Sequence, residues 1–193
     1  MQEDTVIKKE LINASKKLKR LGLLPAFSGN LSYRYNDVIY ITPSMVDKEE
    51  LRINDIAKID MKGRSLNEIK PSSEYRLHIE IYKKRKDIKS VIHTHPAYTI
   101  AFSVSKLKPN FNLAVEFEVL VKNISFSKFK QPGSIELAKE VANKVKDSDV
   151  VVLENHGLVV VSDSIKNGIA ITEEVENFFK INFFVSILNR ITK

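Results

Sequence analysis

Three of the four histidines in this chain lie close to the ends of apolar segments. His93 and His95 belong to the stretch Val91-Ile92-His93-Thr94-His95-Pro96, and His156 follows the apolar residues 150–153. Side chains two positions apart on a β-strand point the same way, so His93 and His95 present two imidazoles to one side. Three histidines near strand ends match a catalytic metal site, in which three protein ligands leave one position open for water or substrate.

The competing interpretation of His93 and His95 is two polar side chains on the solvated face of an edge strand. The H-x-H pattern alone does not decide between the two, and the third histidine, His156, favours the metal site. The chain contains no cysteine, which excludes cysteine-based structural zinc sites. The ligands are therefore nitrogen and oxygen, and the predicted ion is zinc or another divalent transition metal.

Apolar periodicity predicts the elements that must position these side chains. An amphipathic helix is predicted at 5–21, and further helices are predicted from the serines at 72–73 to about 86 and at 97–105, 134–146 and 164–190. Strands are predicted at 31–35, 38–42, 56–60, 91–95, 115–119, 124–129, 150–153 and 158–161. Helices flanking strands that are joined by hairpins predict an α/β fold with a mixed or mostly antiparallel sheet. No linker or repeat interrupts the chain, so residues 1–193 are predicted to form a single domain.

Composition excludes several classes of protein. Hydrophobic residues make up 43% of the 193 residues and are spread throughout, as in a globular chain. No apolar run reaches membrane-spanning length and residues 1–5 carry no signal-peptide core, which predicts a protein without a membrane partner. The absence of cysteine fits the cytoplasm. The net charge of +7 comes without basic residues interleaved with aromatics, so nucleic acid is not a predicted partner, and anionic metabolites are.

A second cluster of polar residues opens the helix that begins near residue 72. Ser72 and Ser73 are preferred N-cap residues, and Glu74 suits the positive end of a helix. Glu74 and His78 are four apart and share a helix face. A helix N-terminus with serines is also an anion site, although capping alone is the simpler role for the two serines.

Five motifs together resemble one family. They are Ser28-Gly29-Asn30-Leu31-Ser32, Ile41-Thr42-Pro43-Ser44, Pro71-Ser72-Ser73-Glu74, His93-Thr94-His95-Pro96 and Asn155-His156-Gly157, in that order along the chain. In order and at this spacing they resemble the class II aldolase/adducin family. The resemblance covers nearly the whole chain and implies a single three-layer α/β/α domain with a central, mostly antiparallel sheet, commonly assembled as a homotetramer. The last helix is apolar all round in its second half, which also indicates a subunit interface.

The resemblance also implies roles for individual residues. His93, His95 and His156 match the three zinc ligands, and Glu74 matches the general acid/base beside the metal. Asn30, Thr42, Ser72 and Ser73 match positions that hold a substrate phosphate. The implied reaction is cleavage of a small ketose phosphate, similar to fuculose 1-phosphate, to dihydroxyacetone phosphate and an aldehyde through a zinc-stabilised enediolate.

Two departures from the family bear on the substrate. Met45 stands where the family usually has a glycine, which affects the expected phosphate pocket. The tyrosine that the fuculose-phosphate aldolases supply after the H-x-H helix is missing, and Glu116 and Glu118 occupy that region.

Three alternatives follow from the same resemblance. In a methylthioribulose-1-phosphate dehydratase a carboxylate downstream of H-x-H acts as base, and Glu118, with Glu116 beside it and Lys122 beyond an apolar stretch, resembles that region. A pentose-phosphate epimerase would use the same metal site. A non-catalytic, adducin-like interaction module is expected to lose ligand residues, and the intact histidine set argues against it.

Overall fold

The computed structural model describes residues 2–105, 107–121 and 123–191. The helices are α1 (Gln2–Arg20), α2 (Tyr75–Lys84), α3 (Ala97–Val104), α4 (Val115–Leu120), α5 (Ile135–Lys144) and α6 (Ile165–Ile191), with short 3₁₀ turns η1 (Ile53–Asp55) and η2 (Phe111–Leu113). The strands are β1 (Asn30–Tyr35), β2 (Val38–Ile41), β3 (Ala57–Asp60), β4 (Ser90–Thr94), β5 (Ile124–Ser127), β6 (Val150–Leu153) and β7 (Gly157–Ser162).

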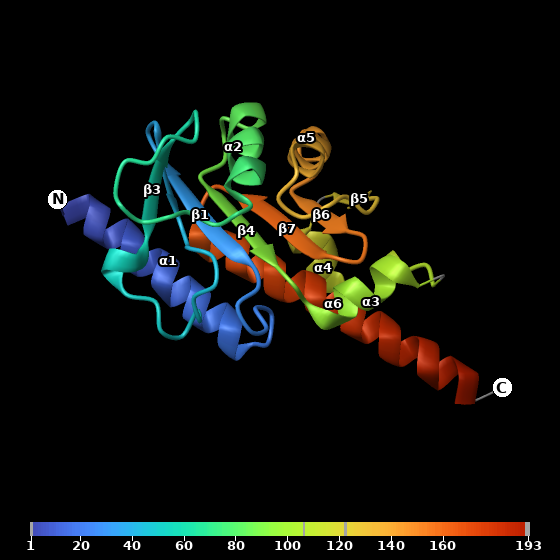
Figure 1. The fold of residues 1–193 in the computed structure, drawn as a ribbon. Coiled ribbons are helices and arrows are strands. Elements are labelled where there is room, and N and C mark those ends of the chain that lie inside the picture. Colours follow the sequence, from blue (N-terminus) through green and yellow to red (C-terminus); the bar gives the residue numbers. More distant parts are fainter. Residues whose placement is uncertain (1, 106, 122, 192–193) are drawn as a thin grey trace.

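Within those described residues, seven strands form one sheet in the order β3-β2-β1-β4-β7-β6-β5. Every neighbouring pair is antiparallel except the edge pair β5–β6, which is parallel. Helices α2 and α5 cover one face, and α1, α3, α4 and α6 cover the other (Figure 1). The prediction of a three-layer α/β/α domain with a mostly antiparallel sheet is confirmed.

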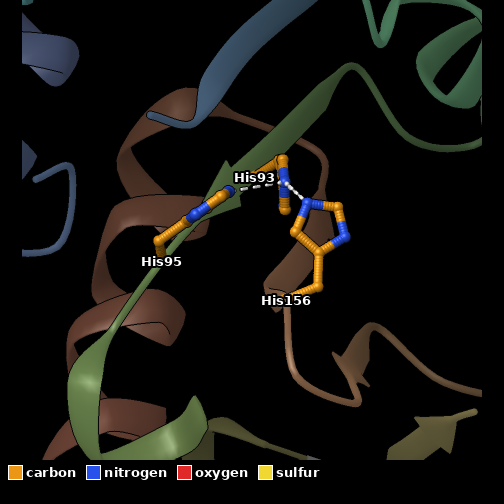
Figure 2. Close-up of side chains that lie close together, drawn as sticks. All are labelled: His93, His95 and His156. Carbon is orange, nitrogen blue, oxygen red and sulfur yellow. Dashed lines mark hydrogen bonds between the residues drawn. The ribbon is translucent and has the colours of Figure 1, made fainter. Parts of the chain in front are cut away.

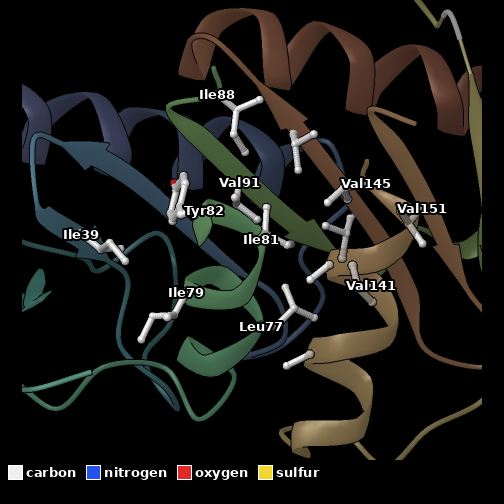
Figure 3. Packing of buried hydrophobic residues seen from close by; sticks show 14 of the residues in the cluster. Ile39, Leu77, Ile79, Ile81, Tyr82, Ile88, Val91, Val141, Val145 and Val151 are labelled. Carbon is white, nitrogen blue, oxygen red and sulfur yellow. The ribbon is translucent and has the colours of Figure 1, made fainter. Parts of the chain in front are cut away.

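The centre of the sheet is buried from both sides. Every residue of β4, β6 and β7 is buried. This explains the continuous apolar run in β6 and at residues 158–161 of β7, where no polar residue alternates with the apolar ones. Val91 of β4 packs with Tyr82 of α2 and Val141 of α5 (Figure 3). Ile92 points to the opposite face and packs with α1 residues such as Leu18. Because β4 lies between β1 and β7, its C-terminal end is a rigid base for the histidines.

The strand predicted at 115–119 is wrong, because these residues form the short helix α4. Phe117 is the one buried side chain of α4, and its ring stacks on Phe178 of α6 with centroids 4.0 Å apart. Val115 and Val119 are 74% and 73% exposed, whereas a half-buried strand would place them and Phe117 on one covered face. The alternation of Glu116 and Glu118 with apolar residues was too short to distinguish a helix held by one aromatic anchor from a strand.

Helix α6 is 27 residues long and extends past the edge of the domain (Figure 1). Its first half is buried through residues such as Val175, Phe178 and Phe179. Its second half exposes Phe184 and Ile191. In the described part of the chain, no helix combines the length and the apolar character needed to cross a bilayer.

Candidate metal centre and active site

His93, His95 and His156 meet at one end of the central strands (Figure 2). His93 lies on β4, His95 follows one residue after β4 ends at Thr94, and His156 occupies the tight turn between β6 and β7. His93 Nε2 is 3.1 Å from His95 Nε2 and 3.3 Å from His156 Nε2. The antiparallel pairing of β4 with β7 brings the distant His156 beside the H-x-H pair.

The three imidazoles fit a divalent ion. His93 Nδ1 lies 3.0 Å from the Leu158 carbonyl oxygen and donates to it, so Nε2 is the nitrogen that can bind a metal. Zn–N bonds of about 2.0–2.1 Å in tetrahedral geometry separate two ligand nitrogens by roughly 3.3 Å, close to the observed separations. The three Nε2 atoms point toward one another, and two of them present lone pairs. This arrangement is electrostatically unfavourable until a cation binds between the three nitrogens. The cluster can therefore hold a metal.

Burial and mutual repulsion keep two of these histidines neutral. Burial, together with the neighbouring His93 charge, lowers the pKa of His95 to about 3 and that of His156 to about 4. Burial also disfavours a charged His93, but the carboxylate of Glu74 outweighs it and raises the His93 pKa. Neutral imidazoles are the form that binds metals, so His95 and His156 are prepared for an ion at neutral pH, and an ion that binds His93 Nε2 displaces a proton from it.

Glu74 lies beside the cluster at the N-terminal end of α2. Its Oε2 is 3.1 Å from His93 Nε2, and its Oε1 is 3.6 Å from His156 Nε2. Burial opposes ionisation of Glu74, but the charge and hydrogen bond of His93 outweigh it and hold the Glu74 pKa well below its usual range. Among the described residues, Oε1 has no hydrogen-bond partner although it is buried. One oxygen of the carboxylate is thus anchored and the other faces the site.

A row of buried side chains supports Glu74 from behind. Asn30 Nδ2 donates to Glu74 Oε2 at 3.0 Å, and Asn30 Oδ1 lies 2.5 Å from His78 Nε2. His78 Nδ1 lies 2.7 Å from Ser32 Oγ, which is 2.8 Å from the Tyr82 hydroxyl. His78 is fully buried and is not one of the three clustered histidines.

The loops next to Glu74 form a cradle of hydroxyl and amide groups. Thr42 Oγ1 accepts from the Leu31 amide at 3.1 Å, and Ser72 Oγ accepts from the Glu74 amide at 3.3 Å. Ser44 Oγ accepts from the Ser73 amide at 2.8 Å. Ser44 Oγ in turn lies 3.5 Å from Ser73 Oγ, to which it donates. The hydroxyls of Thr42 and Ser72 accept from an amide and keep their own hydrogens to donate, which suits an anionic ligand. Ser72 acts from before the helix, since α2 begins at Tyr75 with Glu74 as its N-cap residue.

Residues 9–183 match the family described as Class II Aldolase and Adducin N-terminal domain. The chain belongs to the class II aldolase and adducin family. An L-fuculose phosphate aldolase of Methanococcus maripaludis is 34% identical over 160 residues, which are 83% of this chain and 87% of that protein. A 5-methylthioribulose-1-phosphate/5-deoxyribulose-1-phosphate aldolase of Rhodospirillum rubrum is 33% identical over 167 residues, which are 86% of this chain and 75% of that protein.

A solved structure of an L-fuculose 1-phosphate aldolase has the same fold. It superposes with a TM-score of 0.87 at 30% sequence identity, covering 95% of this chain and 88% of that chain. The relatives named here are enzymes, and the class II aldolase fold accounts for the whole described architecture.

The class II aldolase fold places the predicted site residues in two groups. The first group lies at the histidine cluster or in the loops next to Glu74. Asn30, Glu74, His93, His95 and His156 are joined by direct contacts, and Thr42, Ser72 and Ser73 lie in the adjoining loops. Glu116 and Glu118 lie instead on the exposed surface of α4, across the sheet from α2. A role as second base beside Glu74 would therefore require another chain to present them. Lys122 lies outside the described residues.

Two residues that sequence reasoning missed also border this site. Ser44 was noted only as part of a motif, and nothing in its spacing indicated that it would cap the Ser73 amide. Lys48 is fully buried, and its Nζ lies 3.1 Å from the Val46 carbonyl oxygen and 3.4 Å from that of Phe27. Burial lowers the Lys48 pKa to about 8. This side chain joins the loops on either side of the cradle, a contact that no local pattern predicts.

Met45, which stands where the family usually has a glycine, has a backbone conformation that suits glycine. Met45 has a φ of 58°, in the left-handed region that favours glycine, and its side chain is 75% exposed. The loop thus keeps a glycine-like conformation while carrying a long side chain next to Ser44.

Proposed function

We propose that this chain is a zinc-dependent aldehyde-lyase that cleaves a small ketose phosphate, similar to fuculose 1-phosphate, to dihydroxyacetone phosphate and an aldehyde. The observation that carries the proposal is the convergence of three Nε2 atoms beside a carboxylate whose Oε1 is buried and has no hydrogen-bond partner among the described residues. The names of the two relatives, both sugar-phosphate aldolases, support the substrate class.

The metal would be held by His93, His95 and His156. A divalent ion there supplies Lewis-acid polarisation of a carbonyl oxygen and stabilises the negative charge that develops on it. Retro-aldol cleavage removes one proton from a hydroxyl group and delivers one to the carbon on the other side of the broken bond. Glu74 is ionised and can accept the first proton on Oε1 and deliver it to that carbon, as a general base and then a general acid.

The phosphate would bind in the cradle. The hydroxyls of Thr42, Ser72 and Ser73 donate to it, and Asn30 closes the side nearest Glu74. The N-terminal end of α2 adds the positive end of the helix dipole. Holding the phosphate fixes the distance from the carbonyl group to Glu74, so the cradle contributes orientation as well as affinity.

The test combines metal analysis with an assay for dihydroxyacetone phosphate. The zinc-loaded protein is expected to bind about one ion per chain. A His93→Ala/His95→Ala double variant should lose both metal and activity. Glu74→Gln should keep the metal and lose activity by about 10²- to 10⁴-fold, the usual worth of a positioned acid/base. Glu136→Gln, which changes an exposed glutamate in the first turn of α5, serves as the control and should change neither.

Product analysis separates this reaction from its alternatives. Dehydration yields a diketone phosphate with the carbon chain intact, and epimerisation yields a second ketose phosphate. Loaded protein that converts no ketose 1-phosphate to any of these products defeats the enzymatic proposal and favours the adducin-like module. Full activity of Glu74→Gln refutes the acid/base assignment alone.

We also propose that the chain works in the cytoplasm as a homo-oligomer, with a tetramer as the expected form. The exposed second half of α6 supports the homo-oligomer, because apolar side chains such as Leu188 and Ile191 project from the domain. A Leu188→Glu/Ile191→Glu variant should lower the mass measured by light scattering, and Asn189→Glu, on the same exposed turn, should not. An unchanged mass for the double variant would place the interface elsewhere.

A further inference from the structure

Behind Glu74 runs a continuous row of buried hydrogen bonds that the proposed reaction does not use. It passes from Tyr82 to Ser32, His78 and Asn30 and ends on Glu74 Oε2, with donor–acceptor distances between 2.5 and 3.0 Å. Tyr82, Ser32 and His78 are fully buried, and Asn30 is 3% exposed. A buried polar row of this length needs every hydrogen in the right place, because an unmatched group would be costly.

The direction of each bond follows from the carboxylate. An ionised carboxylate only accepts, so the Asn30 atom facing it must be the NH2 group, and Oδ1 then faces His78. Because Oδ1 also only accepts, His78 Nε2 must carry a hydrogen. Burial, with the nearby charge of His93, lowers the His78 pKa to about 3, so the ring is neutral and carries one hydrogen. His78 Nδ1 is therefore an acceptor, and the Ser32 hydroxyl donates to it. The Tyr82 hydroxyl lies 2.8 Å from Ser32 Oγ and 3.1 Å from the Lys89 carbonyl oxygen, and these two acceptors share its one hydrogen.

We infer that His78 is a positioning residue for Glu74: it donates through Nε2 to Asn30 and so holds the Asn30 NH2 group against the carboxylate. An amide does not pass a proton along, so the row orients Glu74 and is not a proton relay. With its Oε2 held by Asn30, the carboxylate keeps Oε1 turned to the site. The catalytic part of this inference rests on the proposed function.

The supporting geometry comes from two elements. Asn30 and Ser32 are alternate residues of β1 and point to the same face of the sheet, where α2 packs. Glu74 and His78 are one helical turn apart on α2. His78 fits between the two β1 side chains and so connects α2 to β1. Strand β1 pairs with β4, and in this pairing Asn30 lies opposite His93. These contacts fix the position of Glu74 relative to His93 from the side away from the histidine cluster.

Two variants of His78 test the positioning role. In the zinc-loaded enzyme, His78→Leu removes the donor, and the Asn30 amide is then free to turn its oxygen toward the carboxylate. We expect kcat to fall about 10- to 100-fold, the equivalent of one hydrogen bond to a charged group, with metal content unchanged and a smaller change in KM. His78→Gln keeps an N–H near the position of Nε2 and should restore most of kcat.

A matched control removes a buried hydrogen bond elsewhere. Thr172→Val deletes the bond from Thr172 Oγ1 to the Gly168 carbonyl oxygen on α6, at an equally buried position. It should leave kcat unchanged. Wild-type kcat in His78→Leu, or a His78→Gln variant as slow as His78→Leu, overturns the inference. If His78→Leu does not fold, the comparison of His78→Gln with wild type and the spectrum described next still decide it.

A spectroscopic measurement is independent of activity. In zinc-loaded wild-type protein labelled with ¹⁵N-histidine, the His78 ring should show the hydrogen on Nε2 and a bare Nδ1. The opposite tautomer refutes the inference whatever the enzyme does. A protein with the expected tautomer but no lyase activity would defeat the proposed function and leave the positioning of Glu74 standing.

Discussion

At Met45 the backbone adopts a φ of 58°, which costs a residue with a Cβ about 1–2 kcal/mol relative to its preferred regions. Because the Met45 side chain is 75% exposed, replacing it removes little packing. We expect Met45→Gly to be neutral or to raise the free energy of unfolding by up to about 1 kcal/mol, since the greater freedom of glycine in the unfolded chain offsets part of the relief.

The same substitution bears on the substrate, because Met45 adjoins Ser44 in the cradle. Removing its side chain should lower KM for a ketose phosphate without changing kcat. Asn36→Gly is the control, since Asn36 has a φ of 53° in the β1–β2 turn. It should leave KM unchanged. A higher KM in Met45→Gly would mean that the methionine contributes to binding.

Asp4 gives a dependence of stability on pH. Partial burial opposes its ionisation, but hydrogen bonds from Lys58, Lys8 and Tyr40 outweigh this and lower the Asp4 pKa to about 2. The unfolded chain has the higher value of 3.8, so this stabilisation is complete above that pH and is lost as the pH falls through about 2. For a partly exposed carboxylate we expect about 1 kcal/mol.

The measurement is urea unfolding of wild type and Asp4→Asn. Their difference in free energy of unfolding should be largest near pH 6 and clearly smaller near pH 3, because the unfolded carboxylate is by then mostly protonated. Comparing the two proteins cancels the titration of the histidine cluster, which they share. A difference that does not vary with pH would show that Asp4 contributes by packing and not by charge.

Several site residues were predictable because their types and spacing carry information. H-x-H and the strand before His156 indicated a metal site from the sequence, and the serines before Glu74 indicated a helix start. The contact between His78 and Asn30 was not predictable, since it depends on how α2 lies across β1. Glu116 and Glu118 were predicted near the site and do not lie there. They follow the helix after the H-x-H motif in the sequence, but this did not place them near Glu74 in this chain.

At the scale of elements, the turn from β6 to β7 is confined by the end of β4. A Cβ added at Gly157 would lie 2.3 Å from the Thr94 carbonyl oxygen and 3.2 Å from ring atoms of His93 and His95. We expect Gly157→Ala to push the turn away from β4 and lower metal affinity at least 10-fold, as losses around a metal site typically do.

Gly22→Ala is the matched control for this change. Gly22 has a φ of 76°, and an added Cβ there would meet nothing within 4 Å. It should cost about 1 kcal/mol of stability through backbone strain alone and leave metal affinity unchanged. Titration with zinc in the presence of a competing chelator measures both variants. Equal affinities would mean that the turn can move without disturbing the histidines.

Helix and strand types followed from periodicity where a segment was long or clearly bounded. The helix at 164–190 and the hairpin at Asn36 lie within one or two residues of the prediction. The strand predicted at 115–119 failed because one stacking contact between Phe117 and Phe178 sets its conformation. The pairing of β4 with β7 and the parallel pairing of β5 with β6 join segments far apart in sequence, and local patterns do not encode such partners.

For the whole molecule, the metal should contribute to stability. The native fold brings three ligands together and the unfolded chain does not, so an ion at a hundred times its dissociation constant adds about 2.7 kcal/mol. For a chain of this size we expect removal of the metal by a chelator to lower Tm by roughly 5–10 °C. The His93→Ala/His95→Ala variant should show no such shift. Identical Tm values for loaded and stripped wild-type protein would contradict a site that binds only the folded chain.

The separation of the ligands along the chain has a consequence for biosynthesis. His93 and His95 emerge from the ribosome as a pair, and His156 follows only after α3, α4, β5, α5 and β6 have been made. A nascent chain stalled before His156 therefore has two of the three ligands and no β7 beside β4. We expect zinc to enter late, once β7 has paired with β4, so that a chain carrying the ion is one whose central strands have already been assembled.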